Sequence, residues 1–410
     1  MATNNAATKV YQPVSRRNFL KSSTGLAVAA GLAAPRLHAA EAQPPSRPRY
    51  RAAIIGHTGH GDYGHEHELI FNGRHDVEVV AVADPDPAGR AKAAQRCQAQ
   101  RSYADYREMI EKEKPQLVCV TPRWTDQHHA MASAALRQGA HVYSEKPFTQ
   151  TLAEADDLLN LADKGGLKIV VAHQMRLGPS VLHLKKALEE GWIGELLEIR
   201  AHGKQDGRAG GEDMIVLGTH LFDLIRFFAG DPAWCTARIL QNGREVTLQD
   251  VRQATENIGP VIGDEVHAHF AMPKGVNVTF ISRSRYRETA GPWSLELAGS
   301  KGSVKILMNV FPDVYLLKSS EWTAAGQSRE WRPLPNDPTQ SIPAEERRFR
   351  QANQRVVNDW LSAIQENREP VCSGRAAMKA VEMALAVFQA GLSRERVPLP
   401  LAKRSHPLQA

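Results

Sequence analysis

The stretch Ile54-Ile55-Gly56-His57-Thr58-Gly59-His60-Gly61-Asp62-Tyr63-Gly64-His65 decides the fold of this chain. It joins an apolar strand, expected over 51–55, to a glycine turn with the pattern G-x-G-x-x-G, and we expect a helix near 65–72. Such glycines let the backbone approach a pyrophosphate, which the N-terminus of the next helix favours. The motif alone is weak, but its place after a first strand predicts a dinucleotide site. The turn residues expected to bind the cofactor are Gly56, Thr58, Gly59, Gly61, Tyr63 and Gly64.

An acidic residue twenty positions after Gly64 supports the same site. Residues 77–83 form a second apolar strand, and Asp84 follows it directly. A carboxylate at this point accepts hydrogen bonds from ribose hydroxyls and repels a 2′-phosphate. No arginine follows at once, so the sequence favours NAD over NADP. The alternative interpretation is that Asp84 only begins a turn before Pro85.

The pattern of elements predicts two domains after a leader and a linker. Strands alternate with helices through residue 172, which indicates βαβ units and a doubly wound parallel sheet. After about residue 195 come a buried helix over 214–228, antiparallel hairpins and two terminal helices. This order predicts an α+β domain with a large, mainly antiparallel open sheet. The expected divisions are a signal peptide at 1–42, a linker at 43–49, a Rossmann domain at 50–172 and an α+β domain at 173–401, whose terminal helices could pack back on the first domain.

The first forty residues have the features of an export signal. Ser15-Arg16-Arg17-Asn18-Phe19-Leu20-Lys21 is a twin-arginine pattern, followed by a short apolar stretch and the A-x-A site Ala40-Glu41-Ala42. The apolar stretch is too short to span a membrane stably. We therefore expect folded export by the twin-arginine machinery to the periplasm or the medium. These residues also carry +4 of the net charge of +6, so the rest of the chain lacks the basic surface of a nucleic-acid-binding protein.

Several ordered motifs then resemble the Gfo/Idh/MocA oxidoreductase family. They are Thr121-Pro122, His128, Gly139-Ala140-His141-Val142, Glu145-Lys146-Pro147, Gly194-Glu195, Gly218-Thr219-His220-Leu221-Phe222-Asp223 and Pro398-Leu399-Pro400-Leu401. The resemblance extends over roughly residues 50 to 401. It implies an enzyme that transfers a hydride between NAD(H) and a hydroxyl-bearing carbon of a sugar, polyol or glycoside. It also implies a homo-oligomer.

The resemblance assigns roles to individual residues. It places Thr121, Pro122, His128, Glu145 and Lys146 at the cofactor. Lys146 and His220 are the implied catalytic residues, with His220 as the general acid and base. The expected substrate contacts are Lys146, Arg176, Asp213, His220 and Asp223. Asp223 lies three residues after His220 and so on nearly the same helical face, where it could orient the imidazole. Tyr286 and Trp293 are candidates either for a sugar platform or for sheet packing.

The chain also departs from the family pattern. Many members carry Asp-x-Gly-x-His, but Val216 stands here in place of the aspartate, and we expect Asp213 to replace it in part. Two other functions therefore stay open. One is a NAD-dependent glycosidase that oxidises transiently and eliminates an aglycone, although the intact Glu145-Lys146-Pro147 favours net oxidoreduction. The other is an inactive ligand-binding or scaffolding protein, against which Lys146 and His220 argue.

The histidines around the glycine turn do not predict a metal site. His57, His60, His65, His67 and Glu68 lie close together in the sequence, but their spacing matches none of the usual zinc patterns. The glycine turn already explains their neighbourhood. The expectation from sequence is therefore that the protein binds no metal.

Overall fold

The computed structural model describes residues 49–284, 293–323 and 330–409. The expected signal peptide at 1–42, nearly all of the linker, and Tyr286 lie outside the described residues. A six-stranded parallel sheet, in the order β3-β2-β1-β4-β5-β6, organises the first part. Its strands are β1 (Tyr50–Ile55), β2 (Val77–Ala83), β3 (Arg101–Tyr103), β4 (Leu117–Val120), β5 (His141–Ser144) and β6 (Ile169–Val171). This order confirms the predicted doubly wound parallel sheet.

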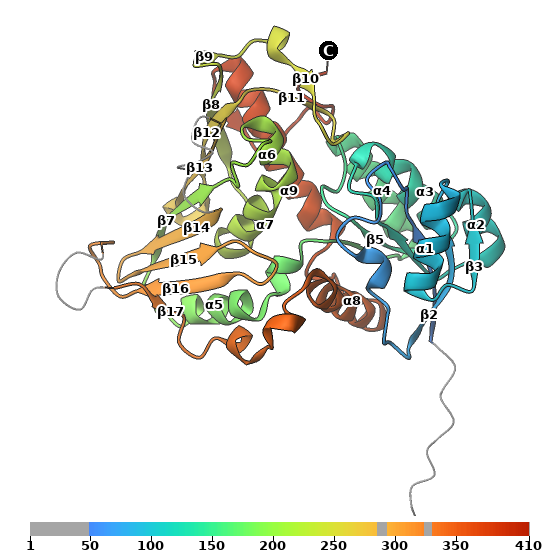
Figure 1. The fold of residues 1–410 in the computed structure, drawn as a ribbon. Coiled ribbons are helices and arrows are strands. Elements are labelled where there is room, and N and C mark those ends of the chain that lie inside the picture. Colours follow the sequence, from blue (N-terminus) through green and yellow to red (C-terminus); the bar gives the residue numbers. More distant parts are fainter. Residues whose placement is uncertain (1–48, 285–292, 324–329, 410) are drawn as a thin grey trace, which may run out of the picture. The chain divides into compact units, whose positions relative to one another are not determined.

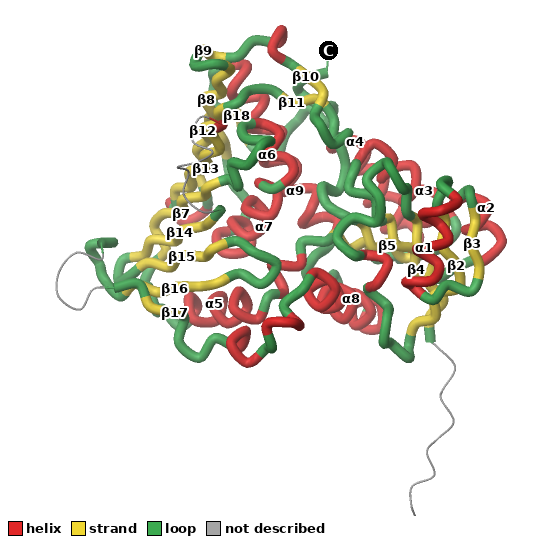
Figure 2. Tube along the Cα trace, viewed as in Figure 1, coloured by secondary structure: helices red, strands yellow, loops and turns green. Residues whose placement is uncertain are grey.

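Both faces of this sheet are buried, which the apolar strands predict. Figures 1 and 2 show helices around the strands: α1 (Pro87–Cys97), α2 (Tyr106–Glu113), α3 (His128–Arg137) and α4 (Leu152–Gly165). One face packs with α2, α3 and α4, whereas the other packs with α1 and with α8 (Phe349–Glu366). Trp360 of α8 is fully buried there, beside the ring of Tyr143. A helix from far along the chain thus completes the core of the first sheet.

The prediction of a helix near residues 65–72 is wrong. The structure has turns here, with only a single 3-10 turn at His67–Leu69. Asp62 and Glu66 adopt left-handed backbone conformations, with φ of 52° and 61°, which interrupt a regular helix. The predicted pyrophosphate site therefore lacks an α-helix N-terminus directly after the glycine turn.

A ten-stranded sheet organises the second part, in the order β17-β16-β15-β14-β7-β13-β12-β8-β18, with β9 beside β8. Its pairs are antiparallel except for β7 with β13. The strands are β7 (Leu196–His202), β8 (Trp234–Gln241), β9 (Arg244–Glu245), β12 (Glu265–Ala271), β13 (Asn277–Arg283), β14 (Ser294–Gly299), β15 (Ser303–Leu307), β16 (Asp313–Leu317), β17 (Arg332–Pro333) and β18 (Val397–Pro398). A separate pair joins β10 (Arg252–Gln253) to β11 (Pro260–Val261). The predicted mainly antiparallel sheet is confirmed.

Helices line one face of the large sheet in Figure 1: α5 (Pro179–Glu189), α6 (Gly211–Val216), α7 (Gly218–Ala229) and α9 (Gly374–Ser393). The single buried helix expected over 214–228 is in fact two helices, α6 and α7, which meet at Leu217. A Cβ at Gly218 would lie 3.3 Å from the Phe280 ring, so glycine allows α7 to begin close against the sheet. His220 lies in the first turn of α7, directly after this junction.

Two further observations concern the cysteines and the apolar character of the helices. The four cysteines, Cys97, Cys119, Cys235 and Cys372, are all buried and free. Within the described ranges, no helix is both long and apolar enough to cross a membrane.

Candidate active site

The glycine turn packs tightly against the loops that follow β4 and β5. Gly61 has a φ of 87°, and a Cβ there would lie 2.7 Å from the backbone nitrogens of Arg123 and Trp124. Gly64 has a φ of 59°, and a Cβ there would lie 2.5 Å from Glu145 Oε2. Neither position accepts a side chain without movement. The turn thus brings the ends of three parallel strands together, where ligands bind in α/β sheets. Gly59, with a φ of 80°, has open space around it.

A cavity of about 280 Å³ lies at the carboxyl ends of β1 and β2, and we call it the strand-end cavity. Gly56 and Asp84 line it together with Ile55, His57, Ala83, Pro85, Ala104, Asp105, Tyr106, Arg107, Gln127 and Met131. Apolar and aromatic walls beside the carboxylates of Asp84 and Asp105 suit the adenosine half of a dinucleotide. The structure therefore brings Gly56 and Asp84 together at a cavity of the predicted kind.

Asp84 is held by the glycine turn. One carboxylate oxygen accepts a hydrogen bond from Thr58 Oγ1 at 2.7 Å, and the other accepts one from the Asp86 backbone at 2.9 Å. The Thr58 backbone nitrogen lies 3.1 Å from the first oxygen as well. A carboxylate offers about four acceptor positions, so a ribose hydroxyl would share Asp84 with Thr58. The structure thus places Thr58 at the acidic residue.

Tyr63 lies over the first glycine. A Cβ at Gly56 would come within 2.2 Å of the Tyr63 ring, so the two residues are in close contact. The hydroxyl is buried without a hydrogen-bond partner among the described atoms. Burial and the neighbouring Asp84 both raise the pKa of this phenol well above its usual value. An unpartnered buried hydroxyl beside Asp84 is a group that a bound ligand could satisfy.

Thr121 and His128 anchor the loop after β4 through buried hydrogen bonds to backbone carbonyls. Thr121 Oγ1 donates to the carbonyl of Ile55 at 2.7 Å. The His128 ring nitrogens face the carbonyls of Pro122 and Phe148, at 2.7 and 3.2 Å. Both side chains are fully buried, so in this structure they position the loop.

A second cavity of about 380 Å³ contains the two candidate catalytic residues, and we call it the central cavity. Lys146 and His220 line it with His65, His67, Arg123, Glu145, Gln174, Met175, Lys204, Arg208, Val216, Leu217, Glu256, Trp293, Met308, Asn309, Val310 and Phe349. These residues come from both halves of the chain. The lining combines cations, two carboxylates, amides and an indole, a set that can bind many hydroxyl groups.

Lys146 follows β5 and is buried. The peptide bond between Lys146 and Pro147 is cis. The Lys146 ammonium donates to the carbonyl of Val216 at 3.1 Å. Burial is the main effect on the Lys146 pKa and lowers it, while nearby Glu145 works in the opposite direction. The backbone of the residue that replaces the usual aspartate thus holds the candidate catalytic lysine.

His220 lies in α7 with a nitrogen free for a ligand. Nδ1 is buried and has no hydrogen-bond partner in the described structure. Burial, followed by the charges of Lys146 and His173, holds the pKa of His220 well below its usual value. The imidazole is therefore neutral near pH 7 and can accept a proton. Trp293 lies against it, with ring centroids 5.9 Å apart.

Arg176 and Asp223 do not line the central cavity, contrary to the prediction. They form a buried ion pair, in which the Arg176 guanidinium donates to the two Asp223 carboxylate oxygens at 2.9 and 2.5 Å. His173 Nδ1 lies 3.5 Å from the same carboxylate, and its ring lies edge-on to His220, with centroids 5.4 Å apart. Asp223 therefore reaches the His220 region only through His173, because Arg176 takes up its carboxylate. Sequence reasoning missed His173, although its place two residues after the end of β6 was a usable signal.

Asp213 does not replace the missing aspartate either. Its carboxylate accepts hydrogen bonds from Ser282 Oγ at 2.6 Å and from the Gln205 backbone at 3.1 Å. It is fully buried against the large sheet and is absent from the cavity lining. Burial raises the pKa of this carboxyl. Ser282 and the Gln205 backbone hold the Asp213 carboxylate against the large sheet, whereas Val216 lines the central cavity.

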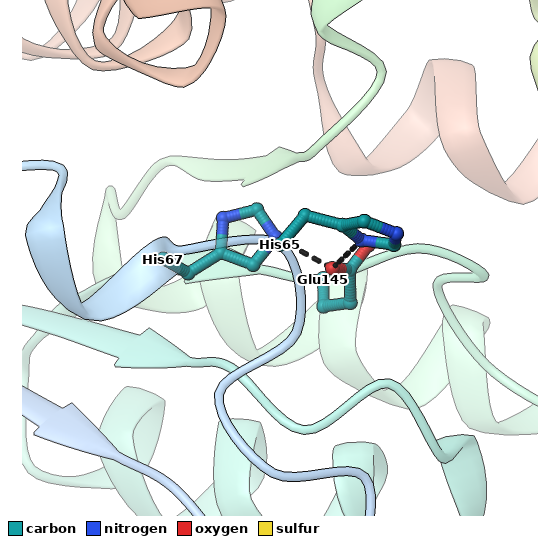
Figure 3. A group of neighbouring side chains, drawn as sticks. All are labelled: His65, His67 and Glu145. Carbon is teal, nitrogen blue, oxygen red and sulfur yellow. Dashed lines mark hydrogen bonds and ion pairs between the residues drawn. The ribbon is translucent and has the colours of Figure 1, made fainter. Parts of the chain in front are cut away.

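His65, His67 and Glu145 converge on one point, as Figure 3 shows. His65 Nδ1 lies 2.8 Å from Glu145 Oε2, and His67 Nε2 lies 2.6 Å from the same oxygen. Burial by itself would raise the pKa of Glu145, but His67 and His65 outweigh it and hold this pKa well below the usual range. Glu145 is thus a buried carboxylate that lies against the glycine turn.

Comparisons with known proteins agree with the two-part fold. The family model described as "Oxidoreductase family, NAD-binding Rossmann fold" matches residues 50–173, and its companion, "Oxidoreductase family, C-terminal alpha/beta domain", matches residues 185–399. A model of the twin-arginine translocation signal sequence matches residues 13–33.

Individual relatives are similar over much of their length. D-apiose dehydrogenase from Paraburkholderia graminis is 23% identical over 359 residues, covering 83% of this chain and 87% of that protein. Levoglucosan dehydrogenase from Pseudarthrobacter phenanthrenivorans is 28% identical over 253 residues, 55% of this chain and 64% of that protein. A solved levoglucosan dehydrogenase in complex with NADH and levoglucosan has a TM-score of 0.68 at 21% identity, covering 85% of this chain and 99% of that one. The structural likeness shows the shared fold.

Proposed function

Because the chain belongs to the Gfo/Idh/MocA oxidoreductase family, with an NAD-binding Rossmann domain and a twin-arginine signal, we propose that it is an exported dehydrogenase of carbohydrates. The proposed reaction transfers a hydride between NAD(H) and a hydroxyl-bearing carbon of a sugar, polyol or glycoside. The observation that carries this proposal is the meeting of Lys146 and His220 in one polar cavity beside the glycine turn. An inactive binding protein would need neither residue in this position.

The chain's residues fit a dinucleotide in two places. The strand-end cavity, with Gly56 and Asp84, would hold the adenosine, and the glycine turn would leave room for the pyrophosphate. Lys146 and Glu145 would lie at the nicotinamide end. When bound, NAD⁺ supplies the hydride acceptor. We propose NAD over NADP because the Asp84 carboxylate would repel a 2′-phosphate.

His220 and Lys146 have complementary tasks in the proposed reaction. Neutral His220 accepts the hydroxyl proton of the alcohol and returns it in the reverse direction. Lys146 donates a hydrogen bond to the same oxygen and stabilises the negative charge that develops on it. The Val216 carbonyl restrains Lys146, so the ammonium is positioned before substrate arrives. Val216 itself contributes an apolar side chain to the cavity, so the proton step rests on one imidazole.

The cavity lining favours a carbohydrate over an apolar substrate. Arg208 forms ion pairs with Asp206 and Glu256, at 2.6 and 2.9 Å, and so presents an ordered polar surface. Trp293 offers an apolar face beside His220. Sugars have both a polar rim and apolar C–H faces, which match such a lining. The named sugar substrates of two relatives agree with this class.

Export sets a condition on the cofactor. A protein carried across the membrane in folded form can load NAD(H) beforehand, but it finds no pool of NAD(H) outside. We therefore propose that NAD(H) stays tightly bound and is recycled by a second carbohydrate substrate in the periplasm or medium. We also propose a homo-oligomer, as the family resemblance implies.

The test is to denature the purified protein and identify the released small molecules by mass spectrometry. We expect close to one NAD or NADH per chain. Paired sugars should then interconvert without added cofactor. An empty protein that binds NADH weakly would refute tight retention, and release of an aglycone without net NADH would identify a glycosidase instead.

The cofactor preference has its own test at Asp84. Replacing Asp84 by serine removes a charged acceptor, and hydrogen bonds to charged groups contribute about 1.5–3 kcal/mol, or roughly 10- to 100-fold in affinity. We expect NADH binding to weaken by that factor while NADPH binding strengthens, measured by titration of nicotinamide fluorescence. Asp86→Ser is the matched control, because serine can keep the cap that Asp86 provides for α1. An unchanged NADH-to-NADPH ratio in Asp84→Ser would rule out the ribose role.

A further inference from the structure

We propose that His65, His67 and Glu145 form a binding site for one divalent transition-metal ion at the wall of the central cavity. The three ligand atoms, His65 Nδ1, His67 Nε2 and Glu145 Oε2, all lie within 4.8 Å of one another. Two imidazoles and one carboxylate are the ligands of catalytic zinc sites and of several iron sites. The expectation of no metal, drawn from the sequence, is thereby revised.

The hydrogen-bonded triad in Figure 3 can accept an ion by a limited rearrangement of its three side chains. Both imidazoles address the same carboxylate oxygen, so each must present a proton to it. An ion with bonds of about 2.1 Å would separate neighbouring ligand atoms by about 3.4 Å in tetrahedral geometry. The two histidine–carboxylate separations are 2.6 and 2.8 Å, and all three atoms lie within 4.8 Å of one another. To bind an ion, the carboxylate oxygen would move away from both rings by less than an ångström while the two imidazole nitrogens approach each other.

The outer partners needed by a metal-binding histidine are already present. His67 Nδ1 lies 3.2 Å from the Tyr143 hydroxyl and 3.3 Å from Asn353 Nδ2. When His67 Nε2 binds an ion, its proton moves to Nδ1, where the Tyr143 hydroxyl can accept it. Asn353 Oδ1 is buried and has no partner in the described structure, so it is a second acceptor if the amide turns. Such partners fix the orientation of metal-binding imidazoles.

The Glu145 carboxylate is also held in place by a hydrogen bond. Glu145 Oε1 accepts a hydrogen bond from the Lys146 backbone at 2.8 Å, which leaves Oε2 for the ion. Glu145 and His67 are fully buried, whereas His65 is about 29% exposed in its side chain. The site is therefore closed toward the protein and accessible from the His65 side.

The position of the site gives it an open coordination face. All three ligands line the central cavity, as do Lys146 and His220. Three protein ligands with a vacant side toward a substrate cavity are typical of catalytic rather than structural metal sites. A substrate oxygen in this cavity could then complete the coordination, and that part of the inference rests on the proposed function. The binding of the ion does not.

The experiment measures metal on the full chain purified without a polyhistidine tag. The protein is stripped with a chelator and titrated with Co²⁺, whose visible absorption reports coordination by nitrogen and oxygen ligands, and then with Zn²⁺ as competitor. Bound metal is counted by mass spectrometry. We expect one Co²⁺ per chain, displaced by Zn²⁺, and at least a 100-fold loss of affinity in His65→Ala and in Glu145→Gln. Asn353→Ala should lose about 10- to 100-fold, as outer partners usually do.

The control is His60→Ala, which removes a histidine of the same turn that pairs with Asp126 instead. It should bind Co²⁺ like the parent protein. Absence of Co²⁺ binding at millimolar concentration, or equal binding by His65→Ala, would overturn the proposal. NADH binding is measured on the same samples. Retained NADH binding without metal would reject only the metal site, whereas metal binding without NADH would reject only the proposed dehydrogenase.

Discussion

Replacing His220 by alanine is expected to lower kcat/KM by about 10²- to 10⁴-fold, the usual contribution of a general acid–base group. Because His220 is buried in α7 and its Nδ1 has no protein partner, the loss should fall mainly on kcat rather than on NADH binding. The measurement is steady-state turnover of the best carbohydrate from the screen, with NADH affinity determined in parallel. His269→Ala is the matched histidine control, because His269 lies in β12 of the large sheet, where its ring contacts the exposed Asn277.

The pH profile extends this test. Burial, Lys146 and His173 hold the His220 pKa well below its usual value, so the neutral base survives as the pH falls through the ordinary histidine pKa of about 6.5. Alcohol oxidation should therefore keep its kcat/KM from pH 8 to pH 6. A half-loss near pH 6.5 in the parent enzyme would contradict a depressed pKa. An unaltered rate in His220→Ala would remove His220 from the mechanism.

Replacing Arg176 by alanine is expected to destabilise the protein strongly. The change leaves the Asp223 carboxylate buried without its guanidinium partner, and breaking such a pair costs about 3–5 kcal/mol. For a chain of this size, that corresponds to a fall in Tm of about 5 °C. Differential scanning calorimetry measures it. Arg375→Ala, which removes an exposed pair with Asp163, should change Tm little.

The buried pair also predicts how stability depends on acid. Burial alone would raise the pKa of Asp223, but Arg176 and His173 outweigh it and hold this pKa below its usual range. The contribution of the pair to stability is therefore present above the unfolded aspartate pKa of about 3.9 and is lost as the pH falls below it.

Replacing both residues, Arg176→Met with Asp223→Leu, should recover much of the Tm. If Arg176→Ala instead had a normal Tm and a raised KM, the structural role of Arg176 would be contradicted. The predicted substrate contact of Arg176 would then be supported.

Features that depend on neighbours in the sequence were predicted well. The sequence Thr151-Leu152-Ala153-Glu154 forms a capping box at the start of α4: Thr151 Oγ1 accepts from the Glu154 backbone at 3.1 Å, and Glu154 accepts from the Thr151 backbone at 3.1 Å. The apolar strand predicted over 77–83 likewise has the bounds of β2 in the structure. Such signals lie within a few residues, so no knowledge of the packing is needed.

The errors arose where one short segment meets distant ones. The turn after Gly64 looked helical, but it packs against the loops after β4 and β5 and against α8, which covers the sheet there. Helical spacing correctly placed Asp223 near the face of His220. It could not reveal that Arg176, reached by a different loop, takes up the Asp223 carboxylate.

The sequence by itself determined the two-sheet fold, the family and the two candidate catalytic residues, because strand and helix periods and short motifs are local properties of the chain. Only the tertiary structure decided which polar groups meet. Glu145 lies 80 residues from His65, and Asn353 reaches His67 from 286 residues away. Contacts over such separations depend on how whole elements pack, and packing brings together side chains whose spacing along the chain carries no pattern.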